Sequence, residues 1–226
     1  MPRDYVAEIL DKRTRVHLSG PRWERFNRRI MPIMHASVEL ANTKALTAKT
    51  KAELFRYFPV AMVAALEGFF RMVYADLINT GEPYSGRAQG FRDLKFGAGP
   101  IVAVQGKKIS AGELIAHQLP HNSFANVEAN MSVLLGKTFR SAITIDGIAP
   151  FAALARGKNF FASMASDLAE MFRVRHVFCH ELATKVTLSP ARAYQLCQAG
   201  VLLAIMTDML MMELLDKGKP FPVIKG

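Results

Sequence analysis

Residues 57–70 read YFPVAMVAALEGFF, a stretch in which Glu67 is the only charged side chain. Arg56 and Arg71 bracket this run, which is shorter than the roughly 20 apolar residues that a bilayer-spanning helix needs. Residues 196–215 are long enough to span a bilayer, but two carboxylates lie among them. We interpret both stretches as buried helices of a soluble bundle and expect no membrane partner.

Local signals around the first stretch indicate where its helix starts and stops. Thr50 and Glu53 have the spacing of a capping box, so we expect a helix over residues 51–79. Pro59 should kink this helix near its start, because proline has no amide hydrogen. Gly81 should end it, since glycine readily adopts the left-handed conformation that follows many helices.

Helical signals cover most of the remaining chain. Apolar residues recur at three- and four-residue spacings over residues 22–47, where Pro32 could interrupt the helix. The other expected helices are a short one opened by a Ser110–Glu113 capping box and three over residues 123–135, 159–184 and 189–218, the last with Ser189 as its N-cap. The pattern predicts an all-α bundle of four or five main helices.

One stretch, residues 81–110, departs from this pattern. It holds six glycines, at Gly81, Gly86, Gly90, Gly97, Gly99 and Gly106. Within it, residues 101–109 predict either a small hairpin or a plain loop. A chain of 226 residues is the size of one domain, so we expect a single domain over residues 1–226 with 81–110 as a Gly-rich insertion.

The familiar sequence signatures of enzymes are absent. The chain has no Gly-rich phosphate loop ending in Lys-Ser/Thr, no G-x-S-x-G, no Cys-x-x-Cys and no Glu-x-x-His. We therefore expect neither a metal nor a cofactor. Only Cys179 and Cys197 occur as cysteines, which favours the reducing cytoplasm over a disulfide-stabilised secreted protein. The N-terminal residues are charged and hold no cleavage-like site, so we expect no signal peptide.

The charge balance favours a polyanionic partner. The formal net charge is +10 at pH 7 and the isoelectric point is about 9.8. Nucleic acid is the first class of partner that such a charge suggests, and an acidic membrane surface is the second. The alternative is a protein that is simply soluble and basic.

An arginine stands inside the apolar stripe of the helix expected at residues 159–184. At about 100° per residue, Arg175 falls in the middle of that stripe. The stripe comprises Phe161, Met164, Leu168, Met171, Phe172, Phe178, Cys179 and Leu182. A guanidinium there cannot neutralise, so it needs a carboxylate, a water-filled crevice or a subunit boundary. We predict that Arg175 meets Glu67 between the two helices.

The same helix resembles a known family. Residues 171–181 read MFRVRHVFCHE, in which four residues separate Arg175 from His180. Residues 66–71, on the earlier helix, read LEGFFR. An Arg followed by a His at this spacing, on a long helix of a small all-α bundle, is similar to the HEPN superfamily (higher eukaryotes and prokaryotes nucleotide-binding). The resemblance covers the helical frame, and residues 81–110 have no counterpart in it.

The resemblance implies an activity and a set of roles. Active HEPN proteins resemble metal-independent endoribonucleases, in which the RNA 2′-hydroxyl attacks the adjacent phosphate. Carried over to this chain, His180 is the general acid–base and Arg175 the phosphate clamp. Glu67 would orient that arginine, and His176 would be a secondary polar partner. The residue types suit the chemistry, because imidazole ordinarily has a pKa near 6.5 and a guanidinium stabilises charge on phosphate.

The resemblance also implies partners. Arg175 and His180 point about 140° apart on a regular helix. In the family, dimerisation commonly brings two motifs to one cleft, so we expect a symmetric homodimer. Such a protein would act on RNA as a toxin or phage-defence effector, with an antitoxin protein as a candidate partner. One family branch has a nucleotidylated Tyr two residues after the His, and Leu182 stands there instead.

Basic residues in the insertion alternate with aromatic ones. They are Arg87, Arg92, Lys95, Lys107 and Lys108, interleaved with Tyr84, Phe91 and Phe96. With Arg173, we predict that these cations contact single-stranded RNA while the rings stack on bases. The alternative is a solvated loop. Arg28 and Arg29 also precede a histidine, His35, at a comparable distance, and we interpret them as a solvated helix face.

Three functional hypotheses stay open at this point. The first is a HEPN-type endoribonuclease. The second is a catalytically silent HEPN bundle that binds RNA, a nucleotide or a partner protein. The third is a structural dimer in which the Arg175–Glu67 pair only fixes the register of two helices.

Overall fold

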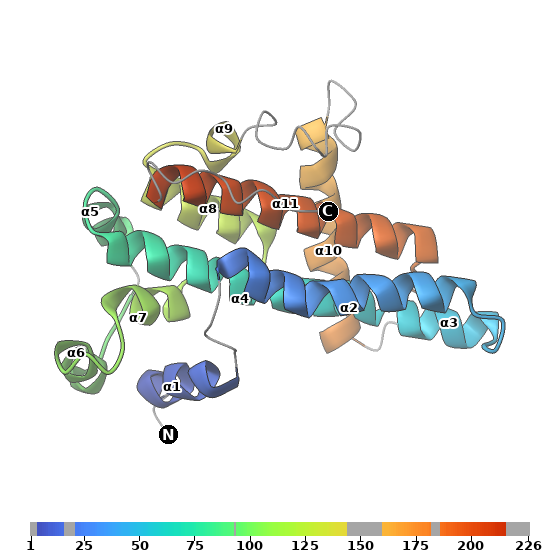
Figure 1. The fold of residues 1–226 in the computed structure, drawn as a ribbon, viewed down its shortest axis with the longest axis horizontal. Coiled ribbons are helices and arrows are strands. Elements are labelled where there is room, and N and C mark those ends of the chain that lie inside the picture. The colour runs from blue at the N-terminus through green and yellow to red at the C-terminus, as the bar shows by residue number, and fades with distance from the viewer. Residues whose placement is uncertain (1–3, 16–20, 93, 144–159, 182–185, 216–226) are drawn as a thin grey trace.

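The computed structural model describes residues 4–15, 21–92, 94–143, 160–181 and 186–215. Within these ranges every regular element is a helix, so the all-α prediction is confirmed. Helices α2 (Arg22–Asn42), α4 (Tyr57–Thr80) and α11 (Pro190–Leu215) run along the long axis of the molecule, and α10 (Phe160–His180) crosses them (Figure 1).

Helix α4 is the centre of the core. It contacts α2, α10, α11 and also α7 (Ala111–Gln118). Its inward side chains are almost fully buried, among them Met62, Val63, Leu66, Phe69, Phe70, Val73 and Leu77. The apolar run that starts at residue 57 therefore forms a core helix, because burial of such a surface is the main force that stabilises a bundle.

The start of this helix differs from the prediction. A separate helix, α3 (Ala48–Phe55), precedes α4, and its N-cap is Thr47, whose hydroxyl accepts from the Thr50 amide at 3.1 Å. The expected Thr50 cap is therefore wrong. The helix is interrupted at Arg56. Pro59 has no amide hydrogen to donate to the Phe55 carbonyl, and its ring would clash with that carbonyl in a continuous helix.

Proline has a smaller effect in α2. This helix continues through Pro32, so the predicted interruption does not occur. Pro32 cannot donate a hydrogen bond to the Arg28 carbonyl. Both residues are exposed, so water can donate to that carbonyl instead. At the other end of α4, Gly81 terminates the helix with a φ of 97°, as predicted.

The Gly-rich stretch is helical where a hairpin or loop was expected. It contains α5 (Tyr84–Arg87), a short 3₁₀ helix at Ala88–Gly90, and α6 (Ala98–Gln105). Helix α6 packs on α1 (Tyr5–Arg15), an element that the sequence patterns did not predict. Ile9 of α1 and Ala103 of α6 form a small second core with Ile109 and Leu114, whereas Ile101 and Val102 of the apolar IVAV run are exposed.

Capping signals placed the remaining helices well. The Ser110–Glu113 capping box opens α7, and Ser123 caps α8 (Phe124–Leu135), which Gly136 ends with a φ of 67°. A short α9 (Phe139–Ala142) follows, and Ser189 caps α11. The expected ends of the last two helices, residues 184 and 218, lie outside the described residues.

Two helical segments are long and apolar enough to cross a membrane by length and composition. They are residues 48–80 and 190–215, and 50% and 56% of their most apolar windows are buried inside the bundle. A core helix of a soluble protein passes the same test, so this is weak evidence for a membrane location. Part of the unburied surface of α4 lines a groove.

Candidate functional site

The predicted contact between Glu67 and Arg175 is present. Nη2 of Arg175 lies 3.4 Å from Oε1 of Glu67, joining α10 to α4, and the two side chains are 24% and 15% exposed. Arg71, one turn further along α4, lies 4.0 Å from the other carboxylate oxygen. The carboxylate is therefore held between two guanidinium groups at the boundary of the core.

The histidines of the motif lie on a different face of α10. His176 and His180 are both exposed, and their ring centroids are 5.0 Å apart because residues four positions apart are neighbours on a helix. Arg173, three residues before His176, is exposed on the same face. The structure therefore groups Arg173 with the histidines, and among the described residues no hydrogen bond or ion pair joins Arg175 to either ring.

The end of α10 departs from the predicted apolar stripe. Cys179 is exposed, so its place in that stripe is wrong. Phe178 is half-buried, and the guanidinium carbon of Arg56 lies over its ring, 5.6 Å from the ring centroid. Leu182 lies outside the described residues.

The cations of the Gly-rich stretch divide into two kinds. Arg87 has a structural partner, because its guanidinium donates to the carbonyls of Leu134 and Leu135 at 3.2 and 2.7 Å, which caps the end of α8. Arg87 is itself exposed, and so are the other four cations, Arg92, Lys95, Lys107 and Lys108.

The aromatic side chains of this stretch do not form a stacking surface. Tyr84 is buried, and Phe91 and Phe96 are partly buried against the two cores. Burial removes Tyr84 from the predicted set of base-stacking rings, whereas Phe91 and Phe96 lie between the short helices and keep part of their surface exposed.

A groove that the sequence analysis did not predict lies between α1, α2, α4 and α7. It has a volume of about 1240 Å³. Its lining includes the basic side chains Lys12, Arg13, Arg22, Arg25, Arg28, Arg29 and Arg71 and the acidic ones Asp76 and Glu113. Four of the arginines come from the first two turns of α2, RWERFNRR. The sequence analysis interpreted two of them, Arg28 and Arg29, as a solvated helix face, and both are exposed.

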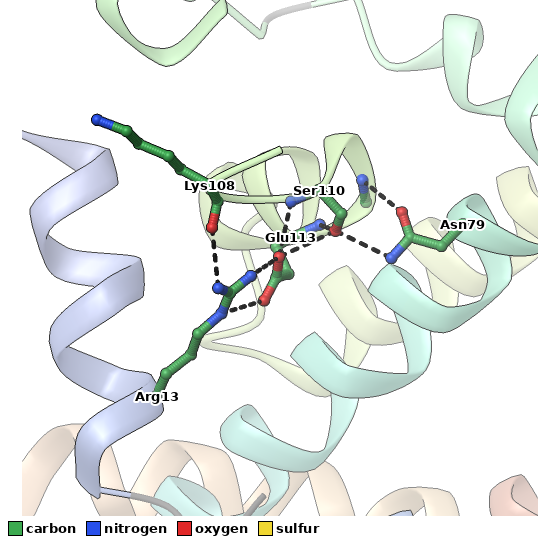
Figure 2. Close-up of polar contacts among 6 residues, drawn as sticks. Arg13, Asn79, Lys108, Ser110 and Glu113 are labelled. Carbon is green, nitrogen blue, oxygen red and sulfur yellow. Dashed lines mark hydrogen bonds and ion pairs between the residues drawn. The ribbon is translucent and has the colours of Figure 1, made fainter. Parts of the chain in front are cut away.

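Two of these arginines hold the walls of the groove together. Arg22 contacts Asp76 at 2.6 Å and Asp208 at 3.3 Å, which joins α2 to α4 and α11. Arg13 forms a two-pronged contact with Glu113, at 2.9 and 2.6 Å, and donates to the Lys108 carbonyl at 2.9 Å (Figure 2). Such bidentate pairs are geometrically specific, so they fix α1 on α7.

The Glu113 carboxylate is also the centre of a wider network. It accepts from the Ser110 amide at 2.8 Å, and the Ser110 hydroxyl accepts from the Asn79 amide group at 2.9 Å (Figure 2). Burial alone would raise the pKa of Glu113, but the hydrogen bonds from Arg13 and Ser110 outweigh it and hold that pKa below its ordinary value. Its negative charge is therefore committed to the fold.

A close backbone approach completes this corner of the groove. Oδ1 of Asn79 accepts from the Gly112 amide at 3.0 Å. A Cβ atom on Gly112 would lie 2.4 Å from the Ala75 carbonyl oxygen, so only glycine allows α7 to approach α4 this closely.

Two buried histidines lie beside the groove. His117 contacts Glu8 at 2.7 Å, and burial lowers its pKa by more than that carboxylate raises it. His121 donates from Nδ1 to the Leu119 carbonyl at 2.6 Å. Burial, and then the positive charge of Arg71, lower its pKa to about 4. Both rings are therefore neutral at pH 7.

Comparisons with known proteins give no family for this arrangement. No family model, no curated protein and no solved structure matches the chain. Across the described ranges, no group of three or more His, Cys, Asp or Glu side chains is placed to hold a metal ion. Function must therefore be argued from the side chains themselves.

Proposed function

We propose that this chain is a metal-independent endoribonuclease of the HEPN type, with its chemistry on the exposed face of α10. The observation that carries the proposal is the pair of solvent-exposed imidazoles, His176 and His180, with ring centroids 5.0 Å apart. Two imidazoles at this separation can reach opposite sides of one phosphodiester, which is the arrangement that concerted acid–base catalysis requires.

The proposed reaction uses each side chain of that face. One imidazole accepts the proton of the RNA 2′-hydroxyl, and the 2′-oxygen forms a bond to phosphorus. The bond from phosphorus to the 5′-oxygen breaks, and the second imidazole donates its proton to that leaving oxygen. The products are a 2′,3′-cyclic phosphate and a 5′-hydroxyl. Arg173 stabilises the charge that develops on the phosphate oxygens.

Arg175 has a positioning role in this proposal. Its contact with Glu67 at the boundary of α4 and α10 fixes the helix that presents the histidines. The exposed quarter of its side chain leaves room for an additional phosphate contact. The proposal keeps the symmetric homodimer, the cytoplasmic location and the role as a toxin or defence effector with an antitoxin.

A second candidate is the catalytically silent bundle that binds RNA, a nucleotide or a partner protein. One observation favours it. Within the described part of the chain, no hydrogen bond or ion pair aligns His176, His180 or Arg173, whereas catalytic imidazoles are usually oriented by a third group.

The test is an RNA cleavage assay in EDTA with single-stranded RNA and the full chain. Variants His176→Ala and His180→Ala should each lose activity by about 100-fold or more, the usual contribution of a general acid or base. His35→Ala is the matched control, because His35 is another exposed helical histidine. Binding without cleavage by the wild-type chain would support the silent bundle, and equal cleavage by all variants would overturn the assignment.

A further inference from the structure

The central helix of the bundle has an uncovered face. Although α4 contacts α2, α7, α10 and α11, Ala64 is exposed and Ala65, Gly68 and Met72 are only half-buried. All four line the groove. A Cβ atom on Gly68 would meet nothing within 4 Å, so the floor here is open space bordered by small apolar groups.

The rim of the groove is positively charged. Arg25, Arg28 and Arg29 line it from α2, Arg71 from α4 and Lys12 from α1. The acidic lining residues Asp76 and Glu113 are paired with Arg22 and Arg13. Among the rim cations, Arg28 lies 3.6 Å from Glu24 and Arg71 lies 4.0 Å from Glu67. The described lining still holds more basic than acidic side chains, so the charge balance of the rim is positive. An occupant of the groove should therefore be apolar on one side and acidic on the other.

We propose that this groove is the docking site for an acidic amphipathic helix of a partner protein. Small floor residues let a second helix approach closely, and its apolar face would cover Ala64, Gly68 and Met72. The floor from Ala64 to Ala75 extends about 16 Å along α4, which equals three turns of a helix. Glutamates and aspartates on the outer face would meet the arginines of the rim.

Other occupants satisfy fewer of these features. A nucleic acid strand would use the rim but not the apolar floor. Among the described lining residues, the rings of Phe26, Phe69 and His117 are only 3%, 1% and 8% exposed, so they are too deeply buried for base stacking. A second copy of the chain that docked symmetrically at this groove would bring its own basic rim against this one, which like-charge repulsion disfavours. The inference goes beyond the proposed nuclease function and does not rest on it.

The test uses a defined probe and the full chain. The probe is a fluorescein-labelled 20-residue helical peptide with Leu and Ala on one face and Glu on the other. A peptide of the same composition in scrambled order is the control for charge alone, and a 20-nucleotide poly-uridine RNA is the nucleic-acid competitor. Fluorescence anisotropy at several salt concentrations gives the affinity of each.

Two variants address the rim and the floor separately. Arg28→Glu/Arg29→Glu reverses two exposed rim charges, and Lys44→Glu/Lys49→Glu makes the same change in net charge on exposed residues outside the groove. Gly68→Leu fills the open floor without a clash at its Cβ, and leucine has a higher helix propensity than glycine.

The proposal predicts a clear order of affinities. The wild-type chain should bind the amphipathic peptide about tenfold more tightly than the scrambled one, and both groove variants should weaken that binding about tenfold while the Lys44/Lys49 control does not. Equal binding of the two peptides, or an unchanged affinity in Gly68→Leu, would overturn it. Displacement of the peptide by RNA with loss of RNA binding in the rim variant would identify a nucleic-acid site instead.

Discussion

Acid should destabilise this protein, and the buried side chain of His121 should account for a measurable part of the effect. His121 has a pKa lowered to about 4, against 6.5 for the free side chain, because burial and the charge of Arg71 disfavour its protonated form. Between these two pH values the unfolded chain binds a proton that the folded chain does not, so stability decreases as the pH falls. From pH 7 to pH 5 the loss from this group alone is about 2 kcal/mol.

The assay is urea unfolding of the wild-type chain and of His121→Asn at both pH values. Asparagine cannot titrate, yet its amide can donate to the Leu119 carbonyl as Nδ1 does now. The variant should lose about 2 kcal/mol less than the wild-type chain between pH 7 and pH 5. Carboxylates such as Glu113 contribute equally to both proteins and cancel in this comparison. Equal losses would refute the argument that a buried neutral imidazole causes the acid sensitivity.

Three further substitutions test the packing. Glu67→Gln removes the charge that holds Arg175 on α4 and should reduce stability by about 1–3 kcal/mol, measured by urea unfolding; no change would show that the contact is only a surface pair. Gly112→Ala should reduce it by about 2 kcal/mol or more, seen as a lower Tm, because its Cβ would clash with the Ala75 carbonyl. Arg13→Ala removes the contact that ties α1 to α7, and hydrogen exchange should become faster in α1 but remain unchanged in α11.

Features that depend on neighbouring residues could be predicted from the sequence. The caps at Ser110, Ser123 and Ser189 and the stop at Gly136 all involve hydrogen bonds or conformations within a few residues. The N-cap of α3 was predicted three residues too late. The capping-box pattern requires Glu or Gln three residues after the cap, which Thr50 has in Glu53, whereas the actual cap, Thr47, is followed at that distance by Thr50.

One long-range contact could also be predicted. Glu67 and Arg175 are charges in otherwise apolar surroundings on two long helices, and each needs the other to avoid the penalty of an unpaired buried charge. Helix geometry also separated His180 from that pair, because Arg175 and His180 point about 140° apart on a regular helix. The packing of α10 was needed only to show that the face with Arg173, His176 and His180 is exposed.

The groove could not be predicted because it depends on four helices at once. The arginines at positions 22–29 were visible as a charged stretch, but whether they face water or an apolar floor depends on α1, α4 and α7. The short run IVAV in α6 was equally ambiguous, since four apolar residues fit a strand as well as a buried helix turn. In the structure the run is helical, with Ala103 in the same small core as Ile9 of α1 and with Ile101 and Val102 exposed.

The central claim is that side chains on the exposed face of α10 catalyse the attack of the RNA 2′-hydroxyl on the adjacent phosphate. The most direct test compares one single-stranded RNA with the same sequence in which every 2′-hydroxyl is methylated, both incubated with the full chain in EDTA. The account predicts that the unmodified RNA is cut to products with 2′,3′-cyclic phosphate ends and that the methylated strand stays intact. Cleavage of both strands, or of neither, would contradict it.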